Sequence, residues 1–111
     1  MKTLSDILHN VSVLETIGTT YVEITSLQMD SRKVKQDNCF VAVKGTASDG
    51  HNFISKCIEQ GATTIVCEVL PQELKSGITY IKVQNTSKTL GVLASNFYDN
   101  PSSKMKVVGV T

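Results

Sequence analysis

Two buried-strand patterns, joined by a glycine-bounded loop and a helical pattern, set the architecture of this 111-residue chain. Residues 39–43 (CFVAV) and 63–67 (TTIVC) are apolar, β-branched runs typical of strands covered on both faces. Between them, apolar residues at helical spacing follow a capping Asn52 and stop at Gly61. A strand, a helix and a strand in this order favour a parallel crossover. We therefore expect an α/β fold, with a mixed, mostly parallel sheet of about five strands flanked by helices.

Further patterns place elements on both sides of this unit. Apolar residues at helical spacing predict a short N-terminal helix, capped by Thr3 or Ser5, with the positions Leu4, Ile7, Leu8 and Val11. Strands are predicted over residues 21–25, about 27–29, 78–83 and 107–111. Another helix is predicted to start at Thr86 or Ser87, to end at residues 100–103, and to bury Leu90, Leu93, Ala94 and Phe97. Because the chain stops inside a strand pattern, we expect it to be part of a longer protein.

Composition restricts the classes of protein to which the chain can belong. With 41% hydrophobic and 19% charged residues, residues 1–111 are expected to form one globular domain. A formal net charge of +1 gives no field that would attract nucleic acid, and no apolar run reaches the roughly 20 residues of a membrane span. Asp6 lies where a signal peptide would be apolar. We therefore expect a cytoplasmic protein, and we expect a monomer.

The three cysteines fit the same compartment. Cys39, Cys57 and Cys67 lie in apolar runs and form no C-x-x-C pair. We interpret them as reduced, buried core residues rather than as catalytic thiols.

The spacing of the polar residues matches no recognised catalytic motif. Gly45 and Gly50 have the spacing of a phosphate-binding P-loop, but His51 and Asn52 follow where that motif requires lysine and serine or threonine. Asp49 is interpreted as a cap of backbone amides rather than as an acid–base partner of His51, which would pack or face solvent. No metal-ligand spacing and no Ser/His/Asp set stands out, so we assign no catalytic and no metal-binding residue. The residues alone predict an α/β binding domain.

Two polar clusters are the best candidates for a ligand site. One is the turn Asp30-Ser31-Arg32, and the other is the loop 45–50 between a strand and a helical pattern. Backbone N–H groups of such a loop and of a helix N-terminus can face an anion.

Four blocks in order resemble the Mur ligases, which add residues to the peptidoglycan stem peptide. The blocks are MDSR at 29–32, FVAVKG at 40–45 with DGHNFI at 49–54, QGA at 60–62, and LASNFYDNPS at 93–102. The run VVGVT at 107–111 is similar to the strand that precedes the family's ATP-binding loop. The block at residues 93–102 favours the tripeptide-forming branch of the family. The dipeptide-adding branch, and an α/β interaction module that binds no nucleotide, are the alternatives.

The resemblance implies an N-terminal domain over residues 1–111 that ends just before the ATP-binding central domain. In such ligases the central domain binds ATP and Mg²⁺, and the C-terminal domain brings the incoming amino acid, meso-diaminopimelate or L-lysine. The N-terminal domain holds the uridine diphosphate (UDP) end of UDP-N-acetylmuramoyl-L-alanyl-D-glutamate (UDP-MurNAc-L-Ala-D-Glu). The implied partners are this substrate and the protein's own central and C-terminal domains. We expect no ATP or Mg²⁺ on this chain, which alone would not be catalytic.

Carried over by position, the UDP-binding residues are Met29, Ser31, Thr46, Ala47 and Ser48. Arg32 is either the charge partner of the diphosphate or one half of a salt bridge that fixes the turn, and we favour the salt bridge.

The chain departs from the family pattern in two places. Residues 46–48 have no histidine or glutamine, and residues 37–39 (DNC) replace a Gly-Asp-Leu type of turn. In that turn we expect Asn38 to take a positive φ.

Overall fold

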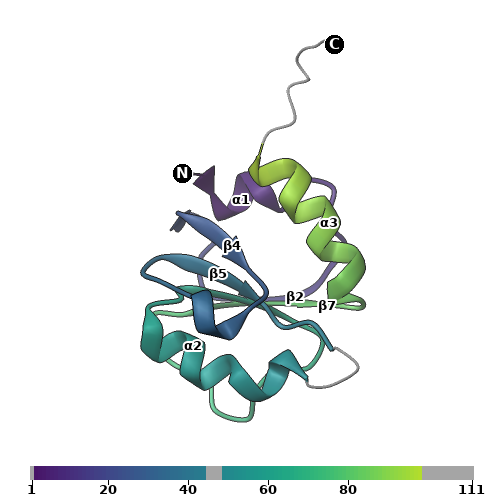
Figure 1. The fold of residues 1–111 in the computed structure, drawn as a ribbon. Coiled ribbons are helices and arrows are strands. Elements are labelled where there is room, and N and C mark those ends of the chain that lie inside the picture. Colours follow the sequence, from purple (N-terminus) through teal and green to yellow (C-terminus); the bar gives the residue numbers. More distant parts are fainter. Residues whose placement is uncertain (1, 45–48, 99–111) are drawn as a thin grey trace.

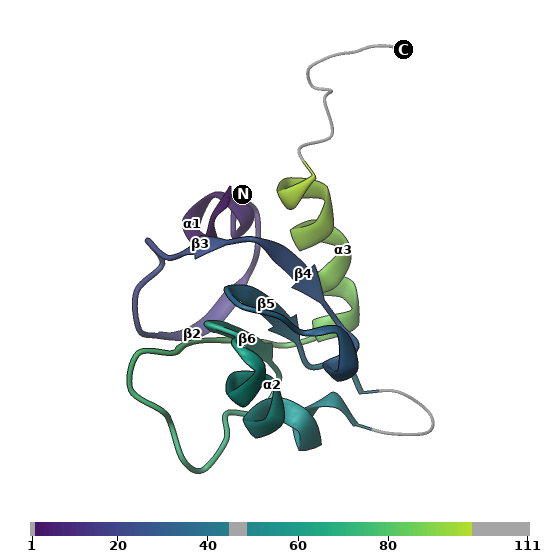
Figure 2. The ribbon, with the colours of Figure 1, turned by 60° about the vertical axis from the view of Figure 1, so that its left-hand side comes forward.

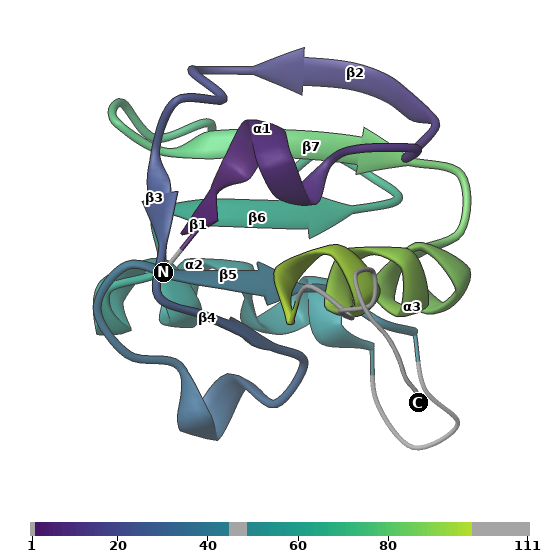
Figure 3. The ribbon, with the colours of Figure 1, turned by 90° about the horizontal axis from the view of Figure 1, so that it is seen from above.

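A five-stranded sheet forms the centre of the computed structural model, which describes residues 2–44 and 49–98. Its order is β2-β7-β6-β5-β4, which Figure 3 shows from above. The strands are β2 (Val13–Ile17), β4 (Ser26–Gln28), β5 (Asn38–Val41), β6 (Thr64–Cys67) and β7 (Thr79–Val83). β4, β5, β6 and β7 pair in parallel, and β2 pairs antiparallel with β7 at one edge. The predicted fold class is therefore confirmed.

Helices cover both faces of the sheet, as Figures 1 and 2 show from two sides. The helices are α1 (Leu4–Ile7), α2 (Ile54–Gln60) and α3 (Thr86–Phe97), with two 3-10 turns, η1 (Ser31–Lys33) and η2 (Gly50–Phe53). α1 and α3 pack on one face and α2 on the other. The result is a three-layer α/β domain.

Each face of the sheet has its own hydrophobic core. Under α1 and α3 the core contains Leu4, Ile7, Ile24, Leu27, Cys39, Val41, Val66, Ile81, Val83 and Leu93. Under α2 it contains Val34, Phe40, Ala42, Ile54, Cys57, Ala62, Ile65, Cys67 and Tyr80. Strands buried on both faces read as continuous apolar runs, and for this reason the sequence reveals β5 and β6 clearly.

Parallel pairing brings the carboxyl ends of β4, β5, β6 and β7 to one edge of the sheet. The register is explicit: Gln28 lies opposite Phe40, Val41 opposite Val66, and Cys67 opposite Lys82. Ligands of open α/β sheets bind outside this edge. A ligand site is therefore expected among the segments that leave this edge.

The N-terminal region differs from the sequence prediction. The helix α1 ends at Ile7, and Asn10 has a φ of 64°, so Leu8 and Val11 pack against the core from outside a helix. Thr3 takes the cap position without a side-chain hydrogen bond. The strand β2 was missed because its three central residues are exposed and carry no apolar alternation.

The strand predicted over residues 21–25 is also shorter in the structure. It is reduced to β3 (Glu23–Ile24), which pairs with β1 (Lys2–Thr3) in a separate two-stranded ribbon. A break at Thr25 separates it from β4, and Thr25 donates its N–H to the Asp37 carbonyl instead. Asp37 holds the positive φ (62°) that we expected at Asn38, because Asn38 is already the first residue of β5.

Two helix caps differ from those predicted, and one is confirmed. Asp49, not Asn52, caps η2, which leads directly into α2. Asn85, not Thr86 or Ser87, caps α3, and its side chain accepts a hydrogen bond from Lys88 N at 2.9 Å. The predicted C-terminal cap Gly61 is confirmed, with a φ of 120° and with Gln36 so close that a Cβ would clash. The predicted strand 107–111 and the predicted helix end at 100–103 lie outside the described residues.

Candidate functional site

A cleft opens at the carboxyl ends of β4 and β5. We call it the β4–β5 cleft, and its volume is about 640 Å³. It is lined by Met29, Asp30, Ser31, Arg32, Phe40, Val43, Gly50, Phe53 and Lys56. One wall follows β4 and the opposite wall comes from η2 and the start of α2. The volume falls within the range of small-molecule sites, and the mixture of apolar surface with a few polar groups is typical of them.

The wall after β4 is a turn held by hydrogen bonds between Asp30 and Arg32. One carboxylate oxygen of Asp30 accepts from Arg32 N (2.9 Å) and Nε (3.1 Å), and the other accepts from Arg32 Nη2 (3.0 Å). The side-chain hydrogen bond and then the backbone hydrogen bond from Arg32 lower the pKa of Asp30 from 3.8 to about 2. The same partner raises the pKa of Arg32. This geometry confirms our interpretation of Arg32 as the residue that fixes the turn.

The opposite wall depends on a close backbone approach at Gly50. Gly50 N donates to the Val43 carbonyl at 2.9 Å, and Lys44 and Asp49 form an antiparallel bridge. A Cβ on Gly50 would lie 2.9 Å from Val43 N and 3.0 Å from Ala42 Cα. Both contacts are to backbone atoms, which move only if the strand end moves. Glycine is therefore required here for packing, although its φ is not positive.

A hydrogen bond joins the helix α2 to the turn after β4. Gln60 Nε2, on α2, donates to the Ser31 carbonyl at 2.5 Å. One turn along the same helix, Lys56 brings a cation to the cleft. The Arg32 guanidinium is already paired with Asp30, so Lys56 is the lining cation without a recorded carboxylate partner within the described part of the chain.

His51 connects the η2 wall to the strand β6. Its Nδ1 lies 2.7 Å from Asp49 Oδ1, and its Nε2 accepts a hydrogen bond from Glu68 N at 2.9 Å. Asp49 Oδ1 also accepts from His51 N at 3.0 Å, and these contacts lower the pKa of Asp49. Asp49 does cap the backbone as predicted. The sequence analysis nevertheless missed the side-chain contact between Asp49 and His51.

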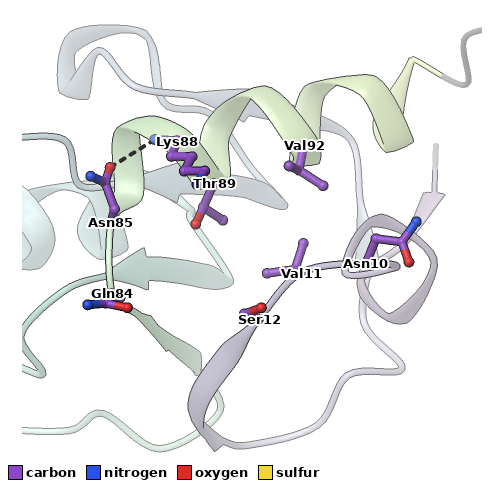
Figure 4. Close-up of a pocket in the computed structure, with 8 residues that line it drawn as sticks. All are labelled: Asn10, Val11, Ser12, Gln84, Asn85, Lys88, Thr89 and Val92. Carbon is purple, nitrogen blue, oxygen red and sulfur yellow. Dashed lines mark hydrogen bonds between the residues drawn. The ribbon is translucent and has the colours of Figure 1, made fainter.

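A second cleft of similar size lies further along the same edge of the sheet. This β7–α3 cleft, shown in Figure 4, has a volume of about 580 Å³. Its lining is Asn10, Val11, Ser12, Gln84, Asn85, Lys88, Thr89 and Val92. Apart from two valines, these side chains are amides, hydroxyls and one ammonium group. The cleft has no aromatic or other large apolar surface against which a base could lie.

The remaining polar chemistry of the described residues adds no further site. Cys39, Cys57 and Cys67 are free and buried, as predicted. Burial raises the pKa of Cys39 to about 12 and those of Cys57 and Cys67 to about 11, so these thiols stay protonated at neutral pH. Over residues 2–44 and 49–98, no group of three or more His, Cys, Asp and Glu side chains could hold a metal ion. In the same part of the chain, no helix is long and apolar enough to cross a membrane.

Comparison with known proteins decides the family. The sequence profile described as "Mur ligase family, catalytic domain" matches residues 23–98. The chain belongs to the Mur ligase family.

Curated Mur ligases resemble the chain closely but are much longer. A UDP-N-acetylmuramoyl-L-alanyl-D-glutamate--2,6-diaminopimelate ligase from Cytophaga hutchinsonii is 48% identical over 97% of this chain. The protein of the same name from Phocaeicola vulgatus is 49% identical over 97% of it. In both cases the match covers 22% of the relative. The chain therefore spans about a fifth of the length of these Mur ligases.

Solved structures of Mur ligases share the fold. MurF from Acinetobacter baumannii matches 91% of this chain with a TM-score of 0.72 and 22% identity. MurF from Thermotoga maritima, solved in complex with ADP, matches 68% of this chain with a TM-score of 0.58 and 31% identity. The matches cover 22% and 17% of those chains.

The family's expected UDP contacts fall partly within the described residues. Met29 and Ser31 both line the β4–β5 cleft, and the Met29 side chain is 56% exposed there. Thr46, Ala47 and Ser48 lie outside the described residues. Both described members of the predicted set therefore share one cleft.

Sequence reasoning missed the other cleft residues of this Mur ligase chain. Phe40 and Phe53 appear in the sequence as core positions, and Lys56 appears as a polar residue of a helix. A signal for Lys56 was available, because it follows Phe53 by three residues and so lies one helical turn further along the same face. No local pattern indicates that β4 and α2 face one another across a cleft.

Proposed function

We propose that this chain is the N-terminal domain of a MurE-type ligase and that its β4–β5 cleft binds the UDP end of UDP-MurNAc-L-Ala-D-Glu. The observation that carries the proposal is the meeting of Met29 and Ser31 in one cleft with Phe53 and Lys56. The names of the similar Mur ligases, which specify this substrate and 2,6-diaminopimelate, support the same assignment.

The chemistry of the cleft suits a pyrimidine nucleotide. Met29, Val43 and Phe53 offer apolar surface for the flat uracil ring, while backbone groups and the Ser31 hydroxyl supply donors and acceptors. Lys56 supplies positive charge for the diphosphate. By the family resemblance, Thr46, Ala47 and Ser48 would supply further polar contacts to the nucleotide end.

The binding energy of this remote handle would serve the reaction elsewhere in the protein. In the full-length ligase it would hold the substrate so that its D-glutamate carboxylate is in place for activation and for attack by the amino group of diaminopimelate. ATP and Mg²⁺ do not fit the described residues, which offer neither a lysine-containing P-loop nor a metal-ligand cluster. We therefore propose that both bind in the remainder of the protein, and that this domain works as part of one cytoplasmic, monomeric polypeptide.

Two alternatives remain distinguishable. A MurF-type ligase would add a dipeptide, and the fold neighbours include MurF proteins. The identities of 48–49% to diaminopimelate ligases against 31% and 22% to these MurF chains favour the MurE type. An interaction module of the same fold would bind no nucleotide.

The decisive assay uses the full-length protein. We expect ADP release that requires both UDP-MurNAc-L-Ala-D-Glu and diaminopimelate, with a tripeptide product. ADP release with D-alanyl-D-alanine and a UDP-tripeptide would identify the MurF type instead. A protein that neither turns over nor binds any uridine compound would leave only the interaction module.

A further inference from the structure

We propose that His51 is a positioning residue of the nucleotide-end site and that it acts as a neutral ring with its proton on Nδ1. This inference rests on the proposed function, because the wall that His51 holds is a wall of the β4–β5 cleft. The family resemblance carries over no role to the His51 side chain.

The tautomer follows from the partners of the ring. His51 Nε2 faces two backbone N–H groups, those of Glu68 at 2.9 Å and Val69 at 3.4 Å. A backbone N–H only donates, so Nε2 must carry the lone pair. The opposite nitrogen, Nδ1, lies 2.7 Å from an oxygen of Asp49, which accepts. The ring is therefore an acceptor at one end and a donor at the other, which is the neutral Nδ1–H form.

This ring links three elements at the carboxyl edge of the sheet. Asp49 caps η2, and Glu68 directly follows β6. The Glu68 carboxylate continues the chain of contacts, because its Oε2 accepts from Thr86 N at 2.9 Å and from the Thr86 hydroxyl at 3.2 Å. The start of α3 is thereby tied to η2 through His51.

His51 affects the cleft through its neighbours in η2. Gly50 and Phe53, which line the cleft, are both in η2, on either side of His51 along the chain. The His51 side chain itself is only 15% exposed and is not among the lining residues. His51 therefore acts on a ligand through the position of Gly50 and Phe53 and not by contact.

Two substitutions test the two ring nitrogens of His51 separately. In His51→Gln the side-chain amide oxygen can take the place of Nε2 and accept from Glu68 N, but the donor to Asp49 is lost. In His51→Asn the amide nitrogen can take the place of Nδ1 and donate to Asp49, but the acceptor for Glu68 N is lost. His9→Gln is the matched control, because His9 is exposed and remote from the cleft lining.

The test measures ring state, binding and kinetics in the full-length protein. With ¹⁵N-labelled histidine, nitrogen–proton correlations should show His51 as the neutral Nδ1–H tautomer at neutral pH. Each His51 variant should weaken binding of UDP-MurNAc-L-Ala-D-Glu by about three- to tenfold, as expected for the loss of one hydrogen bond. KM for ATP and for the amino acid should not change, and His9→Gln should behave as the wild type.

The outcomes keep this inference separate from the proposed function. A wild type that binds the substrate while both His51 variants bind equally well would overturn the inference and leave the proposed function intact. A ring protonated on Nε2, or doubly protonated at neutral pH, would also overturn it. A wild type that does not bind the substrate at all would overturn the proposed function itself. Equal increases in all three KM values, with a lower melting temperature, would reduce His51 to a residue of general stability and so contradict a positioning role.

Discussion

The two clefts at the carboxyl edge of the sheet have similar volumes, about 640 and 580 Å³, and very different chemistry. The β4–β5 cleft combines apolar and aromatic side chains with a fixed ion pair and one further cation. The β7–α3 cleft presents amides, hydroxyls and one ammonium group, and one of its amides, that of Asn85, already caps α3. Both clefts lie at this edge and have similar volumes, so neither property indicates which of them suits a nucleotide. The apolar and aromatic surface of the β4–β5 cleft does indicate it, because a nucleobase needs a flat apolar face to lie against.

The largest effect is expected at Gly50, which lines the β4–β5 cleft. In Gly50→Ala the new Cβ would meet backbone atoms of Ala42 and Val43 at about 3 Å. We expect this overpacking to lower the free energy of unfolding by about 1–3 kcal/mol and to weaken UDP binding by about tenfold or more. Chemical denaturation and calorimetric titration measure the two effects.

Gly91→Ala, in the helix α3 that contributes to the other cleft, is the control. Gly91 does not line that cleft, and a Cβ added to it would meet no atom within 4 Å, so alanine should raise the free energy of unfolding by up to about 1 kcal/mol and leave UDP binding unchanged. Equal effects of the two substitutions on UDP binding would contradict a specific role of Gly50 in the β4–β5 cleft.

Removal of apolar surface should give the next largest effect. Met29→Ala changes a residue that is 56% exposed, so its effect on stability should stay within about 0.5 kcal/mol. We expect UDP affinity to fall by about three- to tenfold, since about 1 kcal/mol of apolar contact is lost. Val92→Ala, in the β7–α3 cleft, should leave affinity unchanged. If Val92→Ala is the more harmful of the two for UDP binding, the site has been placed in the wrong cleft.

Each cleft carries a lysine that can be tested in the same way. Lys56→Gln should weaken UDP binding by about threefold at low salt, because an exposed cation near a phosphate is screened by water. The difference from wild type should shrink as salt is added. Lys88→Gln should have no effect at any salt concentration. A salt-independent loss in Lys56→Gln would show that Lys56 acts through packing instead of charge.

The smallest effect is expected at the ion pair that fixes the turn. The folded-state pKa of Asp30, about 2, is below its ordinary value of 3.8. The stabilisation by ionised Asp30 is therefore present above pH 3.8 and is lost as the pH falls toward 2. Arg32→Gln should return the Asp30 pKa toward 3.8, as followed by carboxyl ¹³C shifts, and should change UDP affinity by about twofold or less at neutral pH. A larger loss would mean that Arg32 contacts the phosphates after all.

The sequence predicts the elements that are buried on both faces and fails where an element is exposed or short. β5 and β6 are unambiguous as apolar runs, whereas β2 has an exposed centre and leaves no such trace. Caps were misplaced by one to three residues because several neighbouring residues can accept the same N–H groups. Asn85, Thr86 and Ser87 are all suitable caps. The Thr86 hydroxyl is engaged by the half-buried Glu68 carboxylate, and Asn85 takes the cap position.

The candidate site shows the same division. Met29 and Ser31 could be named from a sequence motif, because the turn after β4 is local. Phe53 and Lys56 could not, because their place in the cleft depends on how α2 packs across β5 onto η1, through contacts such as that between Gln60 and Ser31. The His51–Glu68 hydrogen bond spans 17 residues and depends equally on the parallel pairing of β5 with β6.

The most direct test of the central claim is a two-dimensional NMR titration of this chain with UDP, with UMP and ADP as controls. We expect shifts confined to the amides of residues 29–32, 43–44 and 49–56, larger for UDP than for ADP, even if the dissociation constant is only about 1 mM (about −4 kcal/mol). Shifts at residues 84–92 in place of these would move the site to the β7–α3 cleft. If the amides of residues 29–32, 43–44 and 49–56 do not shift with UDP in this chain or in the full-length protein, the assignment of the β4–β5 cleft to the nucleotide end is contradicted.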